Sequence, residues 1–194
     1  MSGKLDIFNM ALGFVGTRTL ASENERTPEA AQCALYWDRA RRGALRDFPW
    51  PFSQKKIRLA AVRLPDEQAT EWSRAYAMPR EALKINRLGD FAAFEIGQDN
   101  GQARIFCDEP EAIAVCTVDT PDITLWDELF ITVVAYRLAM FIAVPLLKNN
   151  GAKLQEIAQL YQAALPIAEG HSASEGRRAR TIENDWIAAR EGWQ

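Results

Sequence analysis

The sequence predicts an α+β protein that is mainly helical: a helical bundle with an inserted small antiparallel β unit and a C-terminal arm. Apolar residues recur with the helical period before residue 50 and after residue 125, whereas between about 53 and 118 they alternate as in strands. A small, polar stretch at 169–176 then separates a last helical segment from the rest. We therefore divide the chain into a helical domain, 1–168, and a flexible linker with a C-terminal arm, 169–194.

The first predicted helix covers residues 5–15. Leu5, Phe8, Leu12 and Val15 share one helical face, and Gly16 stands where a left-handed C-cap belongs. The glycines of this stretch do not indicate a phosphate-binding loop, because no strand precedes them and no lysine follows. We interpret them as packing and capping residues.

The helix predicted at 28–47 has the clearest ends. Thr27 is a good N-cap, and Pro28 fits the first helical position, where its missing N–H costs nothing. Pro49 stops the helix. Small residues dominate one face, so another helix can approach closely there. The aromatic side chains that follow the helix are expected to fill a core or to contact a neighbour: Trp50 and Phe52.

The opposite face of this helix is basic. It carries Arg39, Arg42 and Arg46, and Leu35 is an apolar residue among them. Three interpretations are open. The arginines are solvated or pair with nearby carboxylates, or they bind nucleic acid. In a ring of subunits they could instead meet acidic groups on the next subunit, with Leu35 buried in that interface.

The residues after Ser53 predict strands. Lys56 and Arg58 alternate with Ile57 and Leu59, which predicts a strand with one solvent-exposed face. Further extended segments are expected at 72–78, 83–88, 91–96, 103–107 and 113–115. The Asn100-Gly101 pair between two of these segments predicts a hairpin.

The stretch 129–147 is almost continuously apolar, with Arg137 as its single formal charge. Its length reaches the membrane-spanning range. Arg137 near the middle, Pro145 near the end and the lack of basic flanks argue against a membrane helix. We prefer a helix buried in the bundle. Arg137 is then expected to pair with a carboxylate or with backbone carbonyls, because a buried unpaired guanidinium is costly.

The C-terminal part begins with an apolar face at 154–165, which predicts an amphipathic helix packed antiparallel to the preceding one. After the linker, Ile182, Trp186 and Trp193 align on one helical face, preceded by Arg177, Arg178 and Arg180. Two tryptophans on a terminal segment predict a docking arm, although they could also fold back on their own domain. The arginines contact DNA or an acidic partner surface, or are solvated.

Composition excludes several classes of function. The net charge of −3 argues against a protein whose whole surface binds nucleic acid. The cysteines lack metal or redox spacing and suit reduced thiols: Cys33, Cys107 and Cys116. His171, the single histidine, lies in the predicted linker, which argues against His-based triads and most zinc sites. Asp127 and Glu128 are interpreted as helix-start charges. We predict no enzyme, no cofactor and no metal site.

Four segments in combination resemble the tailed-bacteriophage tail tubular protein A family, also called head-to-tail adaptors or tail accessory factors. They are the first helix, IFNMALGFVG, the small-residue helix that ends in FPWPF before a basic alternating strand, and the stretches WSRAYAMPREALKI and AYRLAMFIAVPL. The resemblance spans roughly residues 5 to 165. It implies a helical bundle with a β insertion, in a structural virion protein without catalysis.

The resemblance also implies a function and partners. Such an adaptor joins the phage portal to the tail and forms part of the DNA passage channel, as a ring of about twelve copies. Its partners would be the portal protein, a tail nozzle or hub protein, other copies of itself and, transiently, passing double-stranded DNA, with no membrane. The protein would reside in the tail or neck of the virion, and in the host cytoplasm during assembly.

The candidate residues for contact with the portal or with neighbouring subunits lie on the arginine face of helix 28–47 and in the arm. They are Leu35, Arg39, Arg42, Arg46, Arg177, Arg178, Arg180, Trp186 and Trp193. An acidic overall balance fits a lumen past which DNA slides. The alternative function is a DNA-binding module that uses the arginine face of the same helix.

Overall fold

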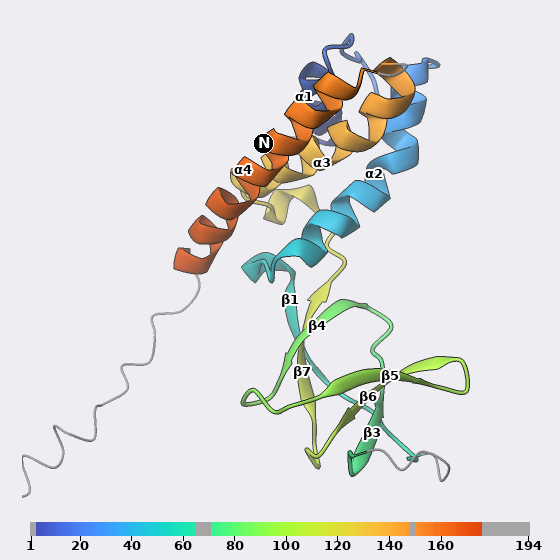
Figure 1. Ribbon diagram of the computed structural model, residues 1–194, viewed down its shortest axis with the longest axis vertical. Coiled ribbons are helices and arrows are strands. Elements are labelled where there is room, and N and C mark those ends of the chain that lie inside the picture. Colours follow the sequence, from blue (N-terminus) through green and yellow to red (C-terminus); the bar gives the residue numbers. More distant parts are fainter. Residues whose placement is uncertain (1–2, 65–70, 148–149, 176–194) are drawn as a thin grey trace, which may run out of the picture.

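A computed structural model describes residues 3–64, 71–147 and 150–175, and in these residues the chain forms two parts that lie end to end (Figure 1). One part consists of four α-helices and the other of seven strands. The end of helix α2 and the start of helix α3 connect the two parts.

The helical part is built around α3, Glu128–Leu147. Helices α1 (Lys4–Val15), α2 (Pro28–Asp47) and α4 (Gly151–Glu175) each pack against it. By length and composition α3 could cross a membrane, but half of its most apolar window is buried inside the protein. Helix α3 therefore packs among the other three helices, as expected, but the burial of this window is only half.

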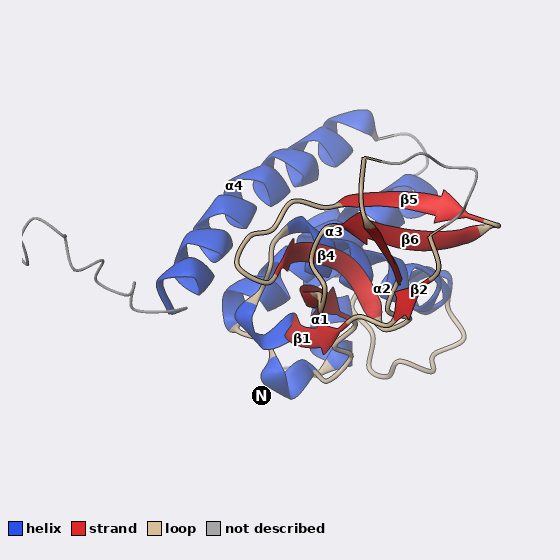
Figure 2. Cartoon of the chain, turned by 90° about the horizontal axis from the view of Figure 1, so that it is seen from below, coloured by secondary structure: helices blue, strands red, loops and turns tan. Residues whose placement is uncertain are grey.

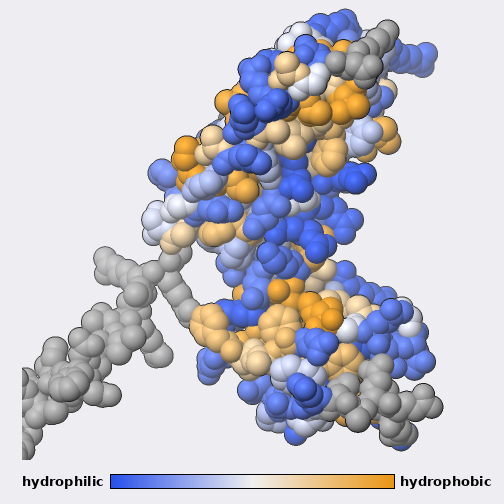
Figure 3. All heavy atoms as spheres, in the orientation of Figure 1, coloured by the Kyte–Doolittle hydropathy of each residue, from blue (hydrophilic) through white to orange (hydrophobic). Residues whose placement is uncertain are grey.

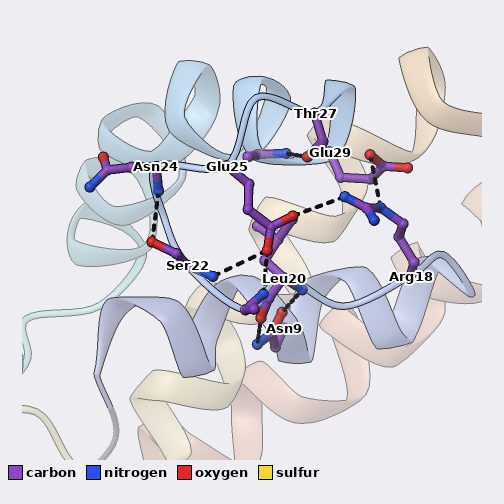
Figure 4. Close-up of polar contacts among 10 residues, drawn as sticks. Asn9, Arg18, Leu20, Ser22, Asn24, Glu25, Thr27 and Glu29 are labelled. Carbon is purple, nitrogen blue, oxygen red and sulfur yellow. Dashed lines mark hydrogen bonds and ion pairs between the residues drawn. The ribbon is translucent and has the colours of Figure 1, made fainter.

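Local signals in the sequence set the ends of α1 and the loop that follows it. Gly16 adopts a φ of +84° and its N–H donates to the carbonyl of Leu12, which closes the helix as predicted. In the loop, the side-chain amide of Asn9 both donates to and accepts from the backbone of Leu20 (3.0 and 2.7 Å; Figure 4). Glu25 accepts a hydrogen bond from the guanidinium of Arg18 (2.9 Å; Figure 4). These bonds hold the loop between α1 and α2 in place.

Helix α2 begins and ends at the predicted signals. The Thr27 hydroxyl accepts from the N–H of Ala30 (3.3 Å), and Pro28 occupies the first turn. After the helix, Trp50 is fully buried, and its indole N–H donates to the carbonyl of Ala44 (2.9 Å). Its ring packs against Phe130 of α3 at 4.9 Å between centroids. Trp50 therefore fills the base of the helical core, which is one of the two roles predicted for it.

The strands form two antiparallel sheets (Figure 2). The first has the order β1 (Gln54–Arg58), β7 (Ile113–Val118), β4 (Ala82–Leu88). The second has the order β2 (Ala61–Val62), β3 (Arg74–Ala77), β6 (Gln102–Cys107), β5 (Glu95–Asp99). The turn between β5 and β6 is Asn100-Gly101, with φ of +48° and +76°, so the predicted hairpin is confirmed.

The predicted fold class, a helical bundle with a small inserted β unit, is wrong. The strands make two sheets with a core of their own, to which Tyr76 and Ile105 of the second sheet and Ile85 and Leu88 of the first contribute. Local alternation located most of the strands, although the segment expected at 91–96 is a strand only at Glu95–Asp99 and β2 was not predicted. Alternation carries no information on pairing between distant segments. The partner of β1 is β7, more than fifty residues later in the chain, and this pairing divides the strands between two sheets.

The predicted linker at 169–176 also differs from the structure, because α4 continues to Glu175. Pro166 lies inside this helix, although proline supplies no N–H to the helical ladder. Ala168 and Ser172 are both buried, and Ala168 packs in the same core cluster as Trp50. This packing favours continuation of the helix past the proline. The predicted arm after residue 175 lies outside the described residues.

Candidate interaction surface on helix α2

The structure places Leu35, Arg39, Arg42 and Arg46 on one exposed face of α2, which we call the outer arginine face. Their spacings of four, three and four residues bring the side chains into a row along the helix. Leu35 is 67% exposed, the largest exposure of any leucine among the large exposed hydrophobic residues of the described chain. An apolar side chain thus stands at one end of a row of cations.

The three guanidinium groups differ in what holds them. Arg39 lies over the ring of Phe141 in α3, 5.3 Å from its centroid. Arg42 Nε is 3.8 Å from Asp119 Oδ2. Arg46 stands exposed in the last turn of α2, where the helix dipole favours a cation. Each of them retains an exposed surface that a partner could contact.

A groove of about 390 Å³ runs beside this row. It lies between α2 and Leu83 of β4, and its other lining residues are Asp38, Arg39, Arg42, Gly43 and Arg46. Three cations and one carboxylate line it, so the groove favours an anionic group. Leu83 comes from the other part of the molecule, and alternation in the strand gave no indication that it would face α2.

Gly43 lines the groove and lies directly against the guanidinium of Arg137. A Cβ at this position would stand 2.5 Å from Arg137 Nε. Arg137 reaches across from α3 to form an ion pair with Asp47 and donates to the Tyr161 hydroxyl (2.7 Å). The expectation that Arg137 meets a carboxylate is confirmed.

Tyr161 completes this cluster from α4, where its hydroxyl donates to Asp47. Burial raises the pKa of Tyr161, and the hydrogen bond to Asp47 raises it further. The hydroxyl therefore stays protonated and keeps its donor role. Asp47, Arg137 and Tyr161 tie α2, α3 and α4 together at one point.

A fourth arginine of α2 has a different role. Arg41 is buried, and its guanidinium donates to both oxygens of Asp119, which follows β7, and to Asp38 (3.1 Å). In the sequence Arg41 is one of four arginines between residues 39 and 46. The helical period alone separates it from the face that carries Arg39, Arg42 and Arg46. The structure makes it the link between the helical part and the first sheet.

A smaller hollow, of about 340 Å³, brings His171 of α4 near Asp127 and Glu128 at the start of α3. His171 was predicted to lie in a linker, and its position on a helix follows from the longer α4. Asp127 and Glu128 lie at the helix start, as expected, and Asp127 Oδ1 also accepts a hydrogen bond from the N–H of Phe130 (2.7 Å), which caps the helix.

The structure gives no metal-ligand cluster among the residues it describes: no three His, Cys, Asp or Glu side chains gather there in a way that could hold an ion. The three cysteines are buried. Burial raises the pKa of Cys33 to about 12 and that of Cys116 to about 11, so both are protonated thiols at neutral pH.

Five predicted contact residues lie outside the described residues: Arg177, Arg178, Arg180, Trp186 and Trp193. Comparison with known proteins finds no matching protein-family model and no matching curated protein. The functional inference for this chain therefore depends on the surface chemistry of its own residues.

Proposed function

We propose that this chain is a structural virion protein, a head-to-tail adaptor whose copies form a ring between the portal of a tailed bacteriophage and its tail. The outer arginine face of α2 would contact the neighbouring subunit or the portal. The observation that supports this best is Leu35, exposed at 67% in line with three guanidinium groups. Protein interfaces are enriched in arginine, aromatic residues and methionine, and depleted in lysine and carboxylates. The arginines therefore fit this composition, and Leu35 adds exposed apolar area beside them.

The bracing of α2 supports the same function. Arg41 ties the helix to Asp119, and Arg137 ties it to α3 through Asp47. These two contacts hold α2 in one position. Few additional side chains then have to be ordered when a partner binds, so the entropic cost of binding is smaller.

A ring places a specific demand on this face. Its subunits meet head to tail, so the arginine face of one copy must meet a different surface of the next. The groove between α2 and Leu83 would take a carboxylate-bearing segment of that neighbour. The ring would hold about twelve copies, with the arm residues after 175 gripping the portal and a tail nozzle or hub protein docking below.

The passage of DNA through the channel also constrains the charge of the protein. The net charge of the chain is −3, which suits a lumen that does not hold the phosphate backbone as DNA passes. Contact with DNA would be transient. The arginines would then face protein rather than the lumen.

Native mass spectrometry of the protein mixed with the portal ring of its own phage tests the proposal. We expect a discrete complex with as many copies of this chain as of the portal subunit. Absence of any complex at concentrations where the portal ring is intact would contradict the adaptor function.

A second function, a DNA-binding module, would use the same three exposed arginines. Asp38 in the groove and Leu35 in the row weigh against it, because neither favours a phosphate backbone. An affinity for duplex DNA that falls steeply with salt concentration would favour this module over the adaptor. Replacing each arginine by glutamine would then reduce the slope of log affinity against log salt concentration by about one.

A further inference from the structure

A second groove, of about 480 Å³, lies at the junction of the two parts. It is lined by Ser172 and Ala173 near the end of α4, by residues that follow α2, and by strands of the first sheet. Figures 1 and 2 show the end of α4 on the side of the molecule where β1 and β4 lie. The volume falls within the range of roughly 300 to 1,000 Å³ typical of pockets that hold drug-sized ligands. It has room for a large side chain.

Both apolar and cationic side chains line this groove. Phe48, Pro49 and Pro51 contribute apolar surface. Lys56 and Arg87 line the same groove, as does Lys55, which forms an ion pair with Glu81 (2.7 Å). Lys56 is exposed, and within the described part of the chain no carboxylate pairs with it. The groove therefore suits a segment that combines an apolar side chain with carboxylates.

An exposed aromatic side chain lies beside one of these cations. The Arg87 guanidinium lies 4.8 Å from the centroid of the Phe91 ring, which is 77% exposed. Phe91 has a φ of +65°, a left-handed conformation that costs a non-glycine residue about 1–2 kcal/mol. Figure 3 shows that apolar side chains gather on the β part just below the hydrophilic waist of the molecule. An arginine stacked on a phenylalanine is a surface on which an indole packs well.

The chain itself carries a segment with this chemistry. Residues 182–193 contain Trp186 and Trp193, together with three carboxylates and a single arginine. The segment follows Glu175, the last described residue, which lies two positions after Ala173 on the groove. The residues between 175 and 186 reach roughly 35 Å when extended, at about 3.3 Å each. A segment tethered this closely has a millimolar effective concentration at the groove.

We propose that this groove binds residues 182–193 of the same chain, with an indole against Pro49 and Pro51 and carboxylates facing Lys56 and Arg87. The proposal concerns the free subunit and does not depend on the adaptor function. It assigns the tryptophans a place on their own subunit, from which a partner would have to displace them.

The test uses the full-length chain labelled with ¹⁵N and follows the indole N–H signals. Trp186→Phe and Trp193→Phe assign the two signals of the segment. We expect the N–H of at least one of these indoles to exchange with solvent at least about tenfold more slowly than that of a free indole. Dilution of the protein should leave this exchange rate unchanged. Lys56→Glu removes this protection, and Asp185→Lys in the same chain restores part of it. Arg74→Glu, on the second sheet outside the groove, leaves it unchanged.

Three outcomes overturn the proposal. Both indoles could exchange as free indoles in the unaltered chain. Protection could survive Lys56→Glu in a chain whose circular dichroism spectrum is unchanged, which would place the indole elsewhere. Protection could fall on dilution, which would assign the groove to the segment of another copy.

Discussion

Arg41, buried in the middle of α2, donates to both carboxylate oxygens of Asp119, a residue that directly follows β7. This pair joins the helical part to the first sheet. Its energetic value depends on burial: the Arg41 side chain is only 5% exposed, so the loss of its partner leaves a cation with little access to water.

We predict that Asp119→Ala lowers the free energy of unfolding by roughly 2–3 kcal/mol, because a buried guanidinium loses its main partner. Asp38→Ala is the matched control, since Asp38 contacts the same guanidinium from a side chain that is 77% exposed. Its effect should stay below about 1 kcal/mol. Urea denaturation measures both, and an equal effect of the two replacements would contradict the role assigned to Asp119.

Gly43→Ala is expected to destabilise the protein, by about 1 kcal/mol or more. Alanine normally favours a helix over glycine by about 1 kcal/mol. Here the new Cβ would stand 2.5 Å from Arg137 Nε, and Arg137 is held by Asp47 and Tyr161. Gly13→Ala in α1 is the control, because no heavy atom lies within 4 Å of its added Cβ. A gain in melting temperature at both positions would show that Arg137 moves aside without cost.

The buried thiols predict a loss of stability at alkaline pH. A cysteine titrates near 8.5 in an unfolded chain, whereas burial raises the pKa of Cys33 to about 12, with Glu29 adding to the effect. Below about pH 8.5 both states bind the proton, and stability from this group is complete. Between about 8.5 and 12 only the folded state binds it, so the free energy of unfolding falls with pH.

The free energy of unfolding should fall by at most about 1.4 kcal/mol per pH unit for each such thiol. We expect Cys33→Ala to have a shallower decline than the unaltered chain above pH 9, even though it is less stable at pH 7 because of the cavity. Denaturant titrations at pH 7 and pH 10 give the two slopes. Identical slopes would mean that Cys33 titrates normally in the folded protein.

Sequence reasoning succeeded where the determining interaction is local. Gly16 ends α1, Thr27 begins α2 and Asn100-Gly101 turns the hairpin because each effect lies within a few residues of its cause. The charge of Arg137 in an apolar helix also required a partner, although only the structure identifies it as Asp47.

The failures concern interactions between distant segments. The pairing of β1 with β7 and the contact of Leu83 with the α2 groove join residues that no periodicity relates. Pro166 is a local stop signal, yet the burial of Ala168 and Ser172 carries the helix past it. At Pro166, tertiary packing overrides a local preference.

The central claim is that the outer arginine face of α2 is a protein contact, and the variant Leu35→Glu tests it most directly. Leu35 is 67% exposed, so its replacement should change the free energy of unfolding by less than about 0.5 kcal/mol. Ile96→Glu is the matched control: Ile96 is 49% exposed and lies in β5, away from this face.

Native mass spectrometry of each variant mixed with the portal ring provides the measurement. We predict that Ile96→Glu assembles with the same copy number as the unaltered chain, whereas Leu35→Glu remains free or gives incomplete rings. Full assembly of Leu35→Glu would contradict the account, because it would place the contact surface of the adaptor on a part of the molecule other than α2.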